Sequence, residues 1–235
     1  MAFGHWMEVK EGEVHLRLGP IRRDEVTRFV AAEARHGLQS YEVARYLGST
    51  MPPTEEGEQE WWDNASKDKD KLHWGIYVPI EGEGDDASDP SWKLVGNTSL
   101  FFNQSDRRQA ESGFLLFDRA YWRQRIASTA HLARTQYAFK ELDLLAITSG
   151  AFAPNEGSNR ALQGVGYVQT GTAYCEVVVG GKPIDANVYL MPNPAEEAWR
   201  YFWRRPEDEI PEAFRLGRER TLATLERAQA AVSFL

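Results

Sequence analysis

The spacing of hydrophobic positions predicts that the chain begins with one strand followed by helices. In residues 24–34, Val26, Phe29 and Val30 share one face of a helix, which is typical of an amphipathic helix packed on a core. A helix start is also predicted after Thr54, because the acidic residues that follow it favour the positive end of the helix dipole. The predicted elements of this part are a strand at residues 14–18 and helices at 24–34, at 41–47 and after 54, the last carrying the aromatic pair Trp61 and Trp62.

The middle of the chain changes to the two-residue alternation of β-strands. Trp74, Ile76 and Val78 alternate with the residues between them, which predicts a strand with two different faces. Residues 81–90 are rich in Gly, Asp and Pro and predict a loop between two strands. Further strands are predicted at residues 93–102 and 111–117, so residues 72–117 read as an antiparallel meander.

Helical spacing returns after residue 121 and then alternates with strands. Ile126, Ala130, Ala133 and Tyr137 lie three to four residues apart, which predicts a helix over residues 126–142. A mostly apolar strand at 144–152, a helix at 155–163, a strand pair at 174–179 and 186–190, and helices at 195–203 and 212–231 follow. This order predicts the α/β (α+β) fold class, with a mixed, mostly antiparallel central sheet flanked by helices.

The length of 235 residues is enough for one well-buried core. We predict a domain over residues 1–191 and a helical C-terminal extension over residues 192–235. The extension carries the apolar run Trp199, Tyr201, Phe202 and Trp203, which is too large a cluster to leave in water. We therefore expect it to pack on the domain or on a partner, and a homodimer is the first expectation.

Charge and cysteine content narrow the class of protein. The formal net charge of −8 makes general nucleic-acid binding unfavourable and would attract a small cationic acceptor. Cys175 is the only cysteine, so no intramolecular disulfide forms and no metal-binding Cys/His spacing exists; we predict no metal site. No apolar run is long enough to span a membrane and the first ten residues show no secretion signal, so no membrane partner and a cytoplasmic location are expected.

Several motifs between residues 110 and 190 occur in an order that resembles a known family. The most specific is Asn155-Glu156-Gly157-Ser158, followed by Leu162 and by Gly166-Tyr167. The others are Ala110-Glu111-Ser112-Gly113-Phe114, Tyr121-Trp122, Tyr137-Ala138-Phe139-Lys140-Glu141-Leu142, and the set Gly181, Asp185 and Tyr189. Together they resemble the GNAT superfamily of acetyl-CoA-dependent N-acetyltransferases, in particular the branch that includes the ribosomal-protein N-acetyltransferases.

The resemblance implies an enzyme that transfers an acetyl group directly from acetyl-CoA, its cosubstrate, to a primary amine. It implies Glu111 as the base that deprotonates the amine, Ser158 as the proton donor to the leaving thiolate, and Asn155 as a ligand of the pantetheine arm. The backbone at Ser112, Gly113 and Phe114 would pair with the same arm. The implied pyrophosphate loop opens the helix at residue 126 and comprises Arg123, Gln124, Arg125, Ile126, Ala127 and Ser128.

Arg125 stands where the family normally keeps a glycine. An arginine has a Cβ and takes a positive φ only at a cost, so we predict that Arg125 keeps a negative φ and that its guanidinium binds a phosphate. The alternative is that its side chain lies across the site and excludes the cofactor. The Arg125→Gly and Arg125→Ala variants distinguish these outcomes.

Other interpretations of the same residues stay open. Asn155 and Ser158 also fit a simple helix cap and first turn, and Glu111 also fits a solvated strand residue. The histidines and the Trp61–Trp62 pair fit structural roles, and Cys175 fits a small buried residue. At the level of function, the alternatives are a degenerate scaffold that binds acyl-CoA without turnover and a protein-interaction module that uses the aromatic run in residues 199–203.

Overall fold

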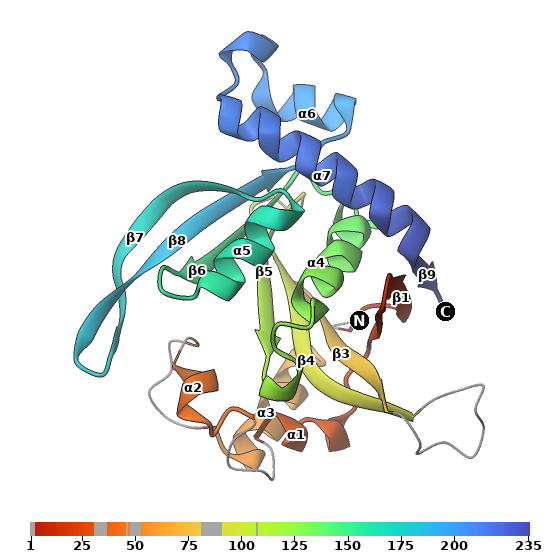
Figure 1. Ribbon diagram of the computed structural model, residues 1–235, viewed down its shortest axis with the longest axis vertical. Helices are drawn as coiled ribbons and strands as arrows, with labels where there is room; N and C mark the ends of the chain where they lie inside the picture. The colour runs from red at the N-terminus through yellow and green to blue at the C-terminus, as the bar shows by residue number, and fades with distance from the viewer. Residues whose placement is uncertain (1–2, 31–36, 46, 48–52, 81–90, 107) are drawn as a thin grey trace. The chain divides into compact units, whose positions relative to one another are not determined.

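The structure, a computed structural model, describes residues 3–30, 37–45, 47, 53–80, 91–106 and 108–235. The chain divides into two compact units, and each is described by itself. The first unit comprises Met1–Ser99, Phe114–Ala130 and Ala231–Leu235, and the second comprises Leu100–Gly113 and His131–Ala230. Figure 1 follows the chain by colour and labels its elements. The predicted loop at residues 81–90 and part of the predicted helix at 24–34 lie outside the described residues.

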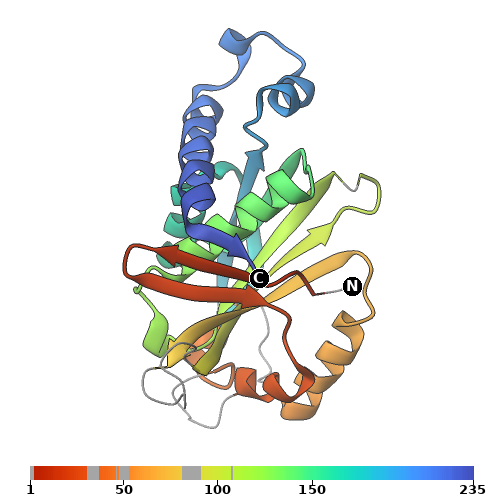
Figure 2. The ribbon, with the colours of Figure 1, turned by 90° about the vertical axis from the view of Figure 1, so that its right-hand side faces the viewer.

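The strands of the first unit pair in the order β9-β1-β2-β3, all antiparallel. Met7 and Val9 of β1 are fully buried and face Leu18 and Leu16 of β2 across the pair, and Gly12 turns the chain between the two strands with a φ of 61°. Figure 2 shows β9 next to β1. Strands β1 and β9 were not predicted from the sequence. The bounds are β1 (Met7–Glu11), β2 (Val14–Gly19), β3 (Lys71–Ile80) and β9 (Val232–Phe234).

Short helices of the first unit pack around an aromatic core. Thr54 caps the longest of them by accepting a hydrogen bond from the Gly57 N–H at 3.0 Å, which confirms the predicted start. Trp61 and Trp62 of this helix pack against a buried cluster that includes Phe29, so the structural interpretation of the pair is correct. The helical elements are η1 (Arg23–Glu25), α1 (Thr27–Val30), α2 (Tyr41–Ala44), α3 (Glu55–Ala65) and η2 (Arg119–Tyr121), and β4 (Ser91–Phe102) begins in this unit.

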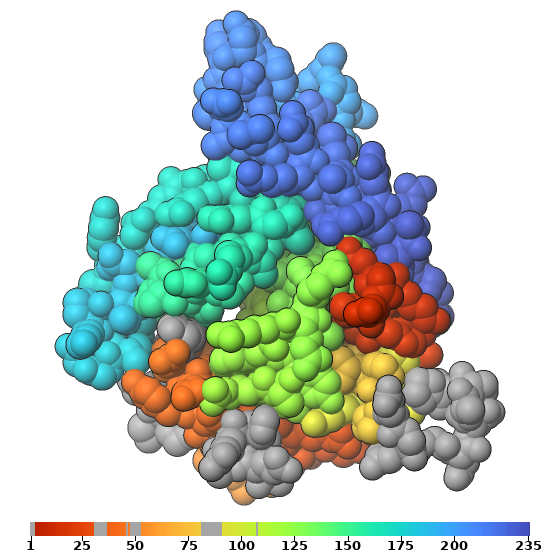
Figure 3. Space-filling model, in the orientation of Figure 1, coloured from red at the N-terminus to blue at the C-terminus, as the bar shows by residue number. Residues whose placement is uncertain are grey.

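The second unit contains a parallel strand pair and a long hairpin. The strand order is β5-β6-β8-β7, in which β5 and β6 are parallel and the other pairs are antiparallel. In Figure 3 the hairpin of β7 and β8 forms the cyan lobe. The bounds are β5 (Gln109–Leu116, of which the last three residues belong to the first unit), β6 (Ala146–Phe152), β7 (Val168–Val179) and β8 (Lys182–Pro192).

The structure of the β7–β8 hairpin shows that the prediction of a buried Cys175 was wrong. Cys175 is exposed, not buried, and has a φ of 52°. The reason is a register shift between Ala173 and Val177, which leaves Cys175 out of the regular ladder, where its N–H donates to the Asp185 carboxylate at 2.9 Å. The first strand of the hairpin also begins at Val168, earlier than the predicted residue 174.

Helices of the second unit follow the predicted order. α4 (Ile126–Gln136) begins in the first unit and ends in a π-helical turn at Tyr137–Glu141, and α5 (Glu156–Val165) ends at Gly166 with a φ of 116°. A Cβ at Gly166 would lie 2.0 Å from the Thr221 hydroxyl of α7, so only glycine fits there. α6 (Glu196–Trp203), η4 (Glu207–Glu209) and α7 (Glu212–Ala231) complete the set. The mixed, mostly antiparallel fold class is confirmed.

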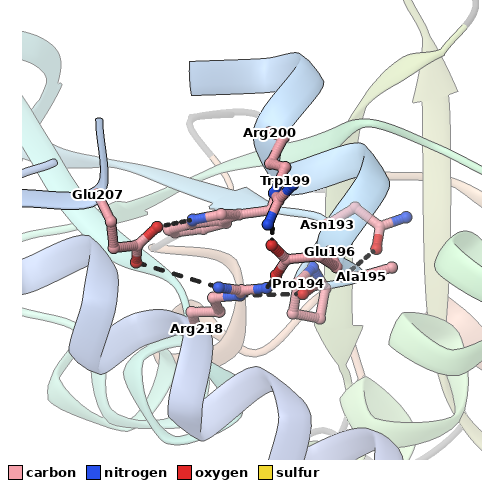
Figure 4. Close-up of polar contacts among 8 residues, drawn as sticks. All are labelled: Asn193, Pro194, Ala195, Glu196, Trp199, Arg200, Glu207 and Arg218. Atoms are coloured by element: carbon pink, nitrogen blue, oxygen red, sulfur yellow. Dashed lines mark hydrogen bonds and ion pairs between the residues drawn. The ribbon is translucent and has the colours of Figure 1, made fainter. Parts of the chain in front are cut away.

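A buried tryptophan joins α6 and α7. Trp199 is 1% exposed, and its indole N–H donates to Glu207 at 3.2 Å. Arg218 of α7 lies over the same ring, donates to the Pro194 carbonyl at 3.0 Å and to Glu196 at 2.6 Å (Figure 4). These contacts hold residues 194–218 together as one small cluster. The domain boundary after residue 191 stays a prediction.

Candidate active site

The parallel pairing between β5 and β6 stops in the middle of both strands. Paired positions run from Gln109 with Ala146 to Ser112 with Ser149. Beyond that point β5 continues to Leu116 and β6 to Phe152, and no further β5–β6 pair occurs among the described residues. Among the described residues, the β5–β6 ladder therefore ends at Ser112 and Ser149.

The predicted base and its neighbour differ in their surroundings. Glu111 is exposed and lies opposite Thr148 in the ladder, as the solvated-strand interpretation also expected. Ser112 is 6% exposed, and its hydroxyl is hydrogen-bonded to the Tyr167 hydroxyl at 2.9 Å. The Ser149 hydroxyl donates to the Ser112 carbonyl at 3.2 Å and closes the last pair of the ladder.

The structure brings Asn155 and Ser158 together at the start of α5. The Asn155 side-chain carbonyl accepts the Ser158 N–H at 3.2 Å, so Asn155 is the helix cap. This bond uses the oxygen of the amide and leaves its NH₂ group without a protein partner among the described contacts. The Ser158 side chain is half-buried on the first turn.

Asn159 organises this loop, although no role was predicted for it from the sequence. Its side-chain amide donates to the carbonyls of Phe152 and Asn155 at 3.0 and 2.8 Å, and its oxygen accepts the Tyr189 hydroxyl at 2.6 Å. Burial raises the pKa of Tyr189, which keeps the hydroxyl protonated as a donor. An asparagine directly after the Asn-x-x-Ser motif was the available signal, because a mid-helix asparagine is usually placed by specific hydrogen bonds.

Arg134 and Tyr167 form a buried polar pair that the helical periodicity alone could not reveal. Arg134 is fully buried on α4 and donates to the Gly113 carbonyl at 3.1 Å and to the Tyr167 hydroxyl at 3.2 Å. Burial lowers the pKa of Arg134 below its usual value. Arginine nevertheless stays protonated in proteins, so this is a buried positive charge.

The predicted pyrophosphate loop lies in the first unit and has an alternating backbone. Arg123 and Arg125 both have a φ of 64°, whereas Gln124 between them has a negative φ. Sign-alternating φ values are typical of backbone nests, in which successive N–H groups converge on an anion. The first N–H groups of α4, at Ile126 and the residues after it, have no partner within the helix, as at any helix start.

The positive φ of Arg125 corrects the expectation of a negative one. The Arg125 carbonyl accepts the Thr129 N–H at 3.0 Å and the Ser128 hydroxyl at 2.8 Å, and these bonds fix the residue at the helix start. Its guanidinium lies 3.7 Å from the Glu11 carboxylate, which also accepts the Thr129 hydroxyl at 2.9 Å. The arginine thus takes the conformation that a glycine takes freely, and its side chain is paired with Glu11.

Metal ions and histidine chemistry receive no support from the described residues. They contain no group of three or more His, Cys, Asp or Glu side chains placed to hold a metal. His73 is buried against Ser99, with its Nδ1 2.7 Å from the Ser99 hydroxyl, and burial lowers its pKa to about 4. His73 is therefore neutral near pH 7 and structural.

None of the described helices is long and apolar enough to cross a membrane.

Similarity to known proteins gives the class of enzyme to which this site belongs. The family model described as "Acetyltransferase (GNAT) domain" matches residues 15–168, so the chain belongs to the GNAT acetyltransferase family and is an acyltransferase. It is 30% identical to a Bacillus subtilis protein named probable N-acetyltransferase YjcK, over 71% of this chain and 91% of the relative.

Solved structures show the same fold at low identity. RimJ of Mycobacterium smegmatis in complex with CoA-disulfide has a TM-score of 0.64 at 14% identity, over 99% of this chain and 97% of that one. Spermidine N-acetyltransferase from Vibrio cholerae in complex with CoA and spermine has a TM-score of 0.62 at 16% identity, over 76% of this chain and 95% of that one. The predicted GNAT family and the mixed α/β fold are confirmed, and the ribosomal-protein branch stays a prediction.

Proposed function

We propose that this acetyltransferase moves an acetyl group from acetyl-CoA to a primary amine, on a small molecule or a protein N-terminus, by direct transfer. The observation that carries the proposal is the end of the β5–β6 ladder at Ser112 and Ser149. An extended pantetheine arm has amide groups that can pair with strand backbone, as in β-augmentation. Because the β5–β6 ladder ends at Ser112, the pantetheine arm could pair with the backbone of β5, the strand that carries Glu111.

The chemistry requires two proton movements, and the chain offers one group for each. The acceptor amine must be neutral to attack, and the exposed carboxylate of Glu111 would take its proton directly or through water. The leaving thiolate needs a proton, and the Ser158 hydroxyl would supply it. Asn155, whose amide NH₂ remains after capping α5, would donate to a carbonyl of the arm.

The nucleotide end of the cosubstrate would bind the loop at Arg123–Ser128. The alternating backbone at Arg123 and Arg125 and the start of α4 both present N–H groups to an anion, which suits a pyrophosphate. The Arg123 side chain is exposed and would add a charge-assisted hydrogen bond. Arg125 would act mainly through its backbone, because its guanidinium is paired with Glu11.

The finer assignments belong to the same proposal. Two similar proteins carry names that fit an amine acceptor, a probable N-acetyltransferase and a spermidine N-acetyltransferase, and the RimJ likeness is compatible with the ribosomal-protein branch. We keep as proposals a cytoplasmic location, a domain at residues 1–191, an extension at 192–235 and a homodimer.

Ligand binding and turnover test the proposal in two steps. Acetyl-CoA at millimolar concentration should raise the unfolding temperature, because a ligand that binds only the native state stabilises it. Free-thiol release should then appear with members of an amine panel. The absence of a thermal shift would refute the proposal. Binding of acetyl-CoA without thiol release for any amine would make the chain a non-catalytic acyl-CoA binder.

Variants test the assigned roles. Glu111→Gln and Ser158→Ala should lower kcat by about 100-fold or more with little change in acetyl-CoA affinity, because both groups move protons in the transition state. Glu156→Gln, which removes another exposed carboxylate, is the matched control and should keep the wild-type rate. Wild-type rates for Glu111→Gln and Ser158→Ala would show that the two residues are a surface carboxylate and a helix-turn residue.

A further inference from the structure

A positive charge is buried next to the point where the β5–β6 pairing ends. Arg134 is 0% exposed, and its guanidinium is within hydrogen-bond distance of the Gly113 carbonyl, one residue beyond the last β5–β6 pair. Removing a cation from water is costly, and the cost is larger where the dielectric is low. A buried arginine at this place therefore calls for an explanation beyond packing.

Hydrogen bonds connect this charge to both strands. Arg134 donates to the Tyr167 hydroxyl at 3.2 Å, Tyr167 is bonded to the Ser112 hydroxyl at 2.9 Å, and Ser149 donates to the Ser112 carbonyl at 3.2 Å. All four side chains are buried. The network thus fixes the last pair of the ladder and the first peptide beyond it, and it draws on α4, β5, β6 and Tyr167, the second residue after α5.

The guanidinium has two physical effects on the Gly113 peptide. Its hydrogen bond holds the carbonyl and so fixes the orientation of the peptide plane, which is rigid. Its charge also withdraws electron density from that peptide and creates a positive potential nearby, which is strong because the surroundings exclude water. A positive potential stabilises the negative charge that develops on a thioester oxygen when an amine attacks it.

We propose that Arg134 is a positioning residue for acyl transfer: it holds the Gly113 peptide and supplies a fixed positive potential to the thioester carbonyl of the bound acyl-CoA. This inference rests on the proposed function, which places the pantetheine arm along the strand that carries Glu111, and it adds that the thioester end of that arm lies at Ser112–Phe114. Arg134 would not touch the acetyl group. It would act through Gly113, and through its charge.

Two substitutions separate charge from packing. Arg134→Met removes the charge and keeps an unbranched side chain of similar length, and replacing a buried charge by an apolar side chain is often tolerated by the fold. Arg134→Lys keeps the charge and loses the planar fork. Tyr167→Phe is the matched control, because it removes hydrogen bonds from the same network without changing its charge.

The kinetic expectation is a fall in kcat with a nearly constant KM for acetyl-CoA. Arg134→Met should lose about 10- to 100-fold in kcat, less than the loss seen for a donor that contacts an oxyanion directly. Arg134→Lys should retain at least about a third of the wild-type kcat, and Tyr167→Phe should stay within about threefold of wild type, because both keep the positive charge. A residue that only packs would instead change stability and KM together.

The experiment that decides is infrared spectroscopy of acetyl-CoA labelled with ¹³C at the carbonyl, bound to the full chain, alongside the kinetics. The thioester band should move to lower wavenumber on binding wild type, Arg134→Lys and Tyr167→Phe, and the shift should shrink in Arg134→Met. If Arg134→Met does not fold, Arg134→Lys still tests the idea, since a loss of both kcat and the band shift despite the retained charge overturns it. Unchanged kcat and band shift in folded Arg134→Met overturn it too. Failure of wild type to bind acetyl-CoA would instead refute the proposed function.

Discussion

Two arginines of the candidate phosphate loop carry a backbone conformation that favours glycine. Arg123 and Arg125 each have a φ of 64°, which costs a residue with a Cβ about 1–2 kcal/mol. Such strain persists where the surroundings fix the residue, and it is common at binding sites. For Arg125 the surroundings are the bonds from Thr129 and Ser128 to its carbonyl. The sequence showed that glycine was missing, but not that the backbone would keep the shape of a glycine loop.

Paired substitutions at Arg125 measure this strain. Arg125→Gly and Arg125→Ala both remove the guanidinium and its contact with Glu11, but only glycine relieves the positive φ. We expect the glycine variant to be more stable than the alanine variant by about 1 kcal/mol, partly offset by the larger freedom of glycine in the unfolded chain. Urea unfolding of the two variants measures the difference. An alanine variant of equal or greater stability would show that the loop does not hold this φ in solution.

The same pair tests the role of the side chain in binding. Because the guanidinium is paired with Glu11, we expect CoA affinities of the two variants within about threefold of wild type, since an exposed ion pair is worth little. A much weaker affinity in both variants would make the guanidinium a phosphate ligand. A tighter affinity in Arg125→Gly alone would show that arginine obstructs the site.

Glu58 should make the stability of the fold depend on pH, and a substitution of Glu58 can test this. Burial raises the pKa of Glu58 from 4.5 to about 7. Below pH 4.5 the Glu58 carboxyl keeps its proton in both the folded and the unfolded chain. Between pH 4.5 and 7 only the folded chain keeps it, so the free energy of unfolding falls as the pH rises. Above pH 7 this loss of stability is complete. Glu58→Gln should therefore raise the unfolding temperature at pH 8 and leave it nearly unchanged at pH 4.5.

An exposed glutamate on the same helix provides the control for Glu58. Glu60→Gln should shift the unfolding temperature little, and equally at both pH values, because its side chain is solvated. Calorimetry of the wild type and both variants at pH 4.5 and 8 checks this. Equal effects of Glu58→Gln at the two pH values would show that its carboxyl ionises normally in the folded chain.

At the scale of elements, the periodicity of hydrophobic residues predicted those helices and strands that are set by contacts between residues near one another in the chain. The helical spacing from Ile126 to Tyr137 correctly predicted α4, but the final turn is π-helical, with the Leu142 N–H bonded to the Tyr137 carbonyl at 3.1 Å. Strands β1 and β9 were missed because each is short, and β9 is stabilised by pairing with β1 near the other end of the chain. Pairing partners far apart in the chain leave no local signal in the sequence.

The contact between α6 and α7 provides a prediction at this scale. Trp199→Ala should destabilise the fold by about 3–5 kcal/mol, because it empties a buried site and removes the partner of Glu207 and Arg218. Tyr201→Ala on the same helix is the control: Tyr201 is 51% exposed, so its loss should cost less than about 1 kcal/mol. Urea unfolding curves of the two variants make the comparison. Similar costs for both would mean that α6 does not pack as described.

For the molecule as a whole, motifs predicted the family and supplied candidate catalytic positions, but they did not reveal the hydrogen-bond network behind those positions. The order of Glu111, Asn155 and Ser158 along the chain is enough to suggest a site, because each belongs to a short pattern. Arg134 and Asn159 were not found, since their roles depend on contacts with residues such as Gly113 and Tyr189 that only folding brings near. A helical arginine is normally solvated, so its sequence context favours the wrong environment.

The final strand suggests a test of how the whole chain associates. β9 covers the edge of β1 through the pairs of Met7 with Phe234 and Val9 with Val232. A chain ending at Ala231 would expose that edge, and an uncovered strand edge is a template for pairing with another chain. We expect this shorter chain to lose on the order of 1–3 kcal/mol of stability through lost backbone hydrogen bonds. Light scattering should show a larger mass per particle than the full chain has, with the full chain carrying Leu235→Ala as the control that keeps the strand backbone. Unchanged stability and mass in the shorter chain would show that β9 does not protect β1 in solution.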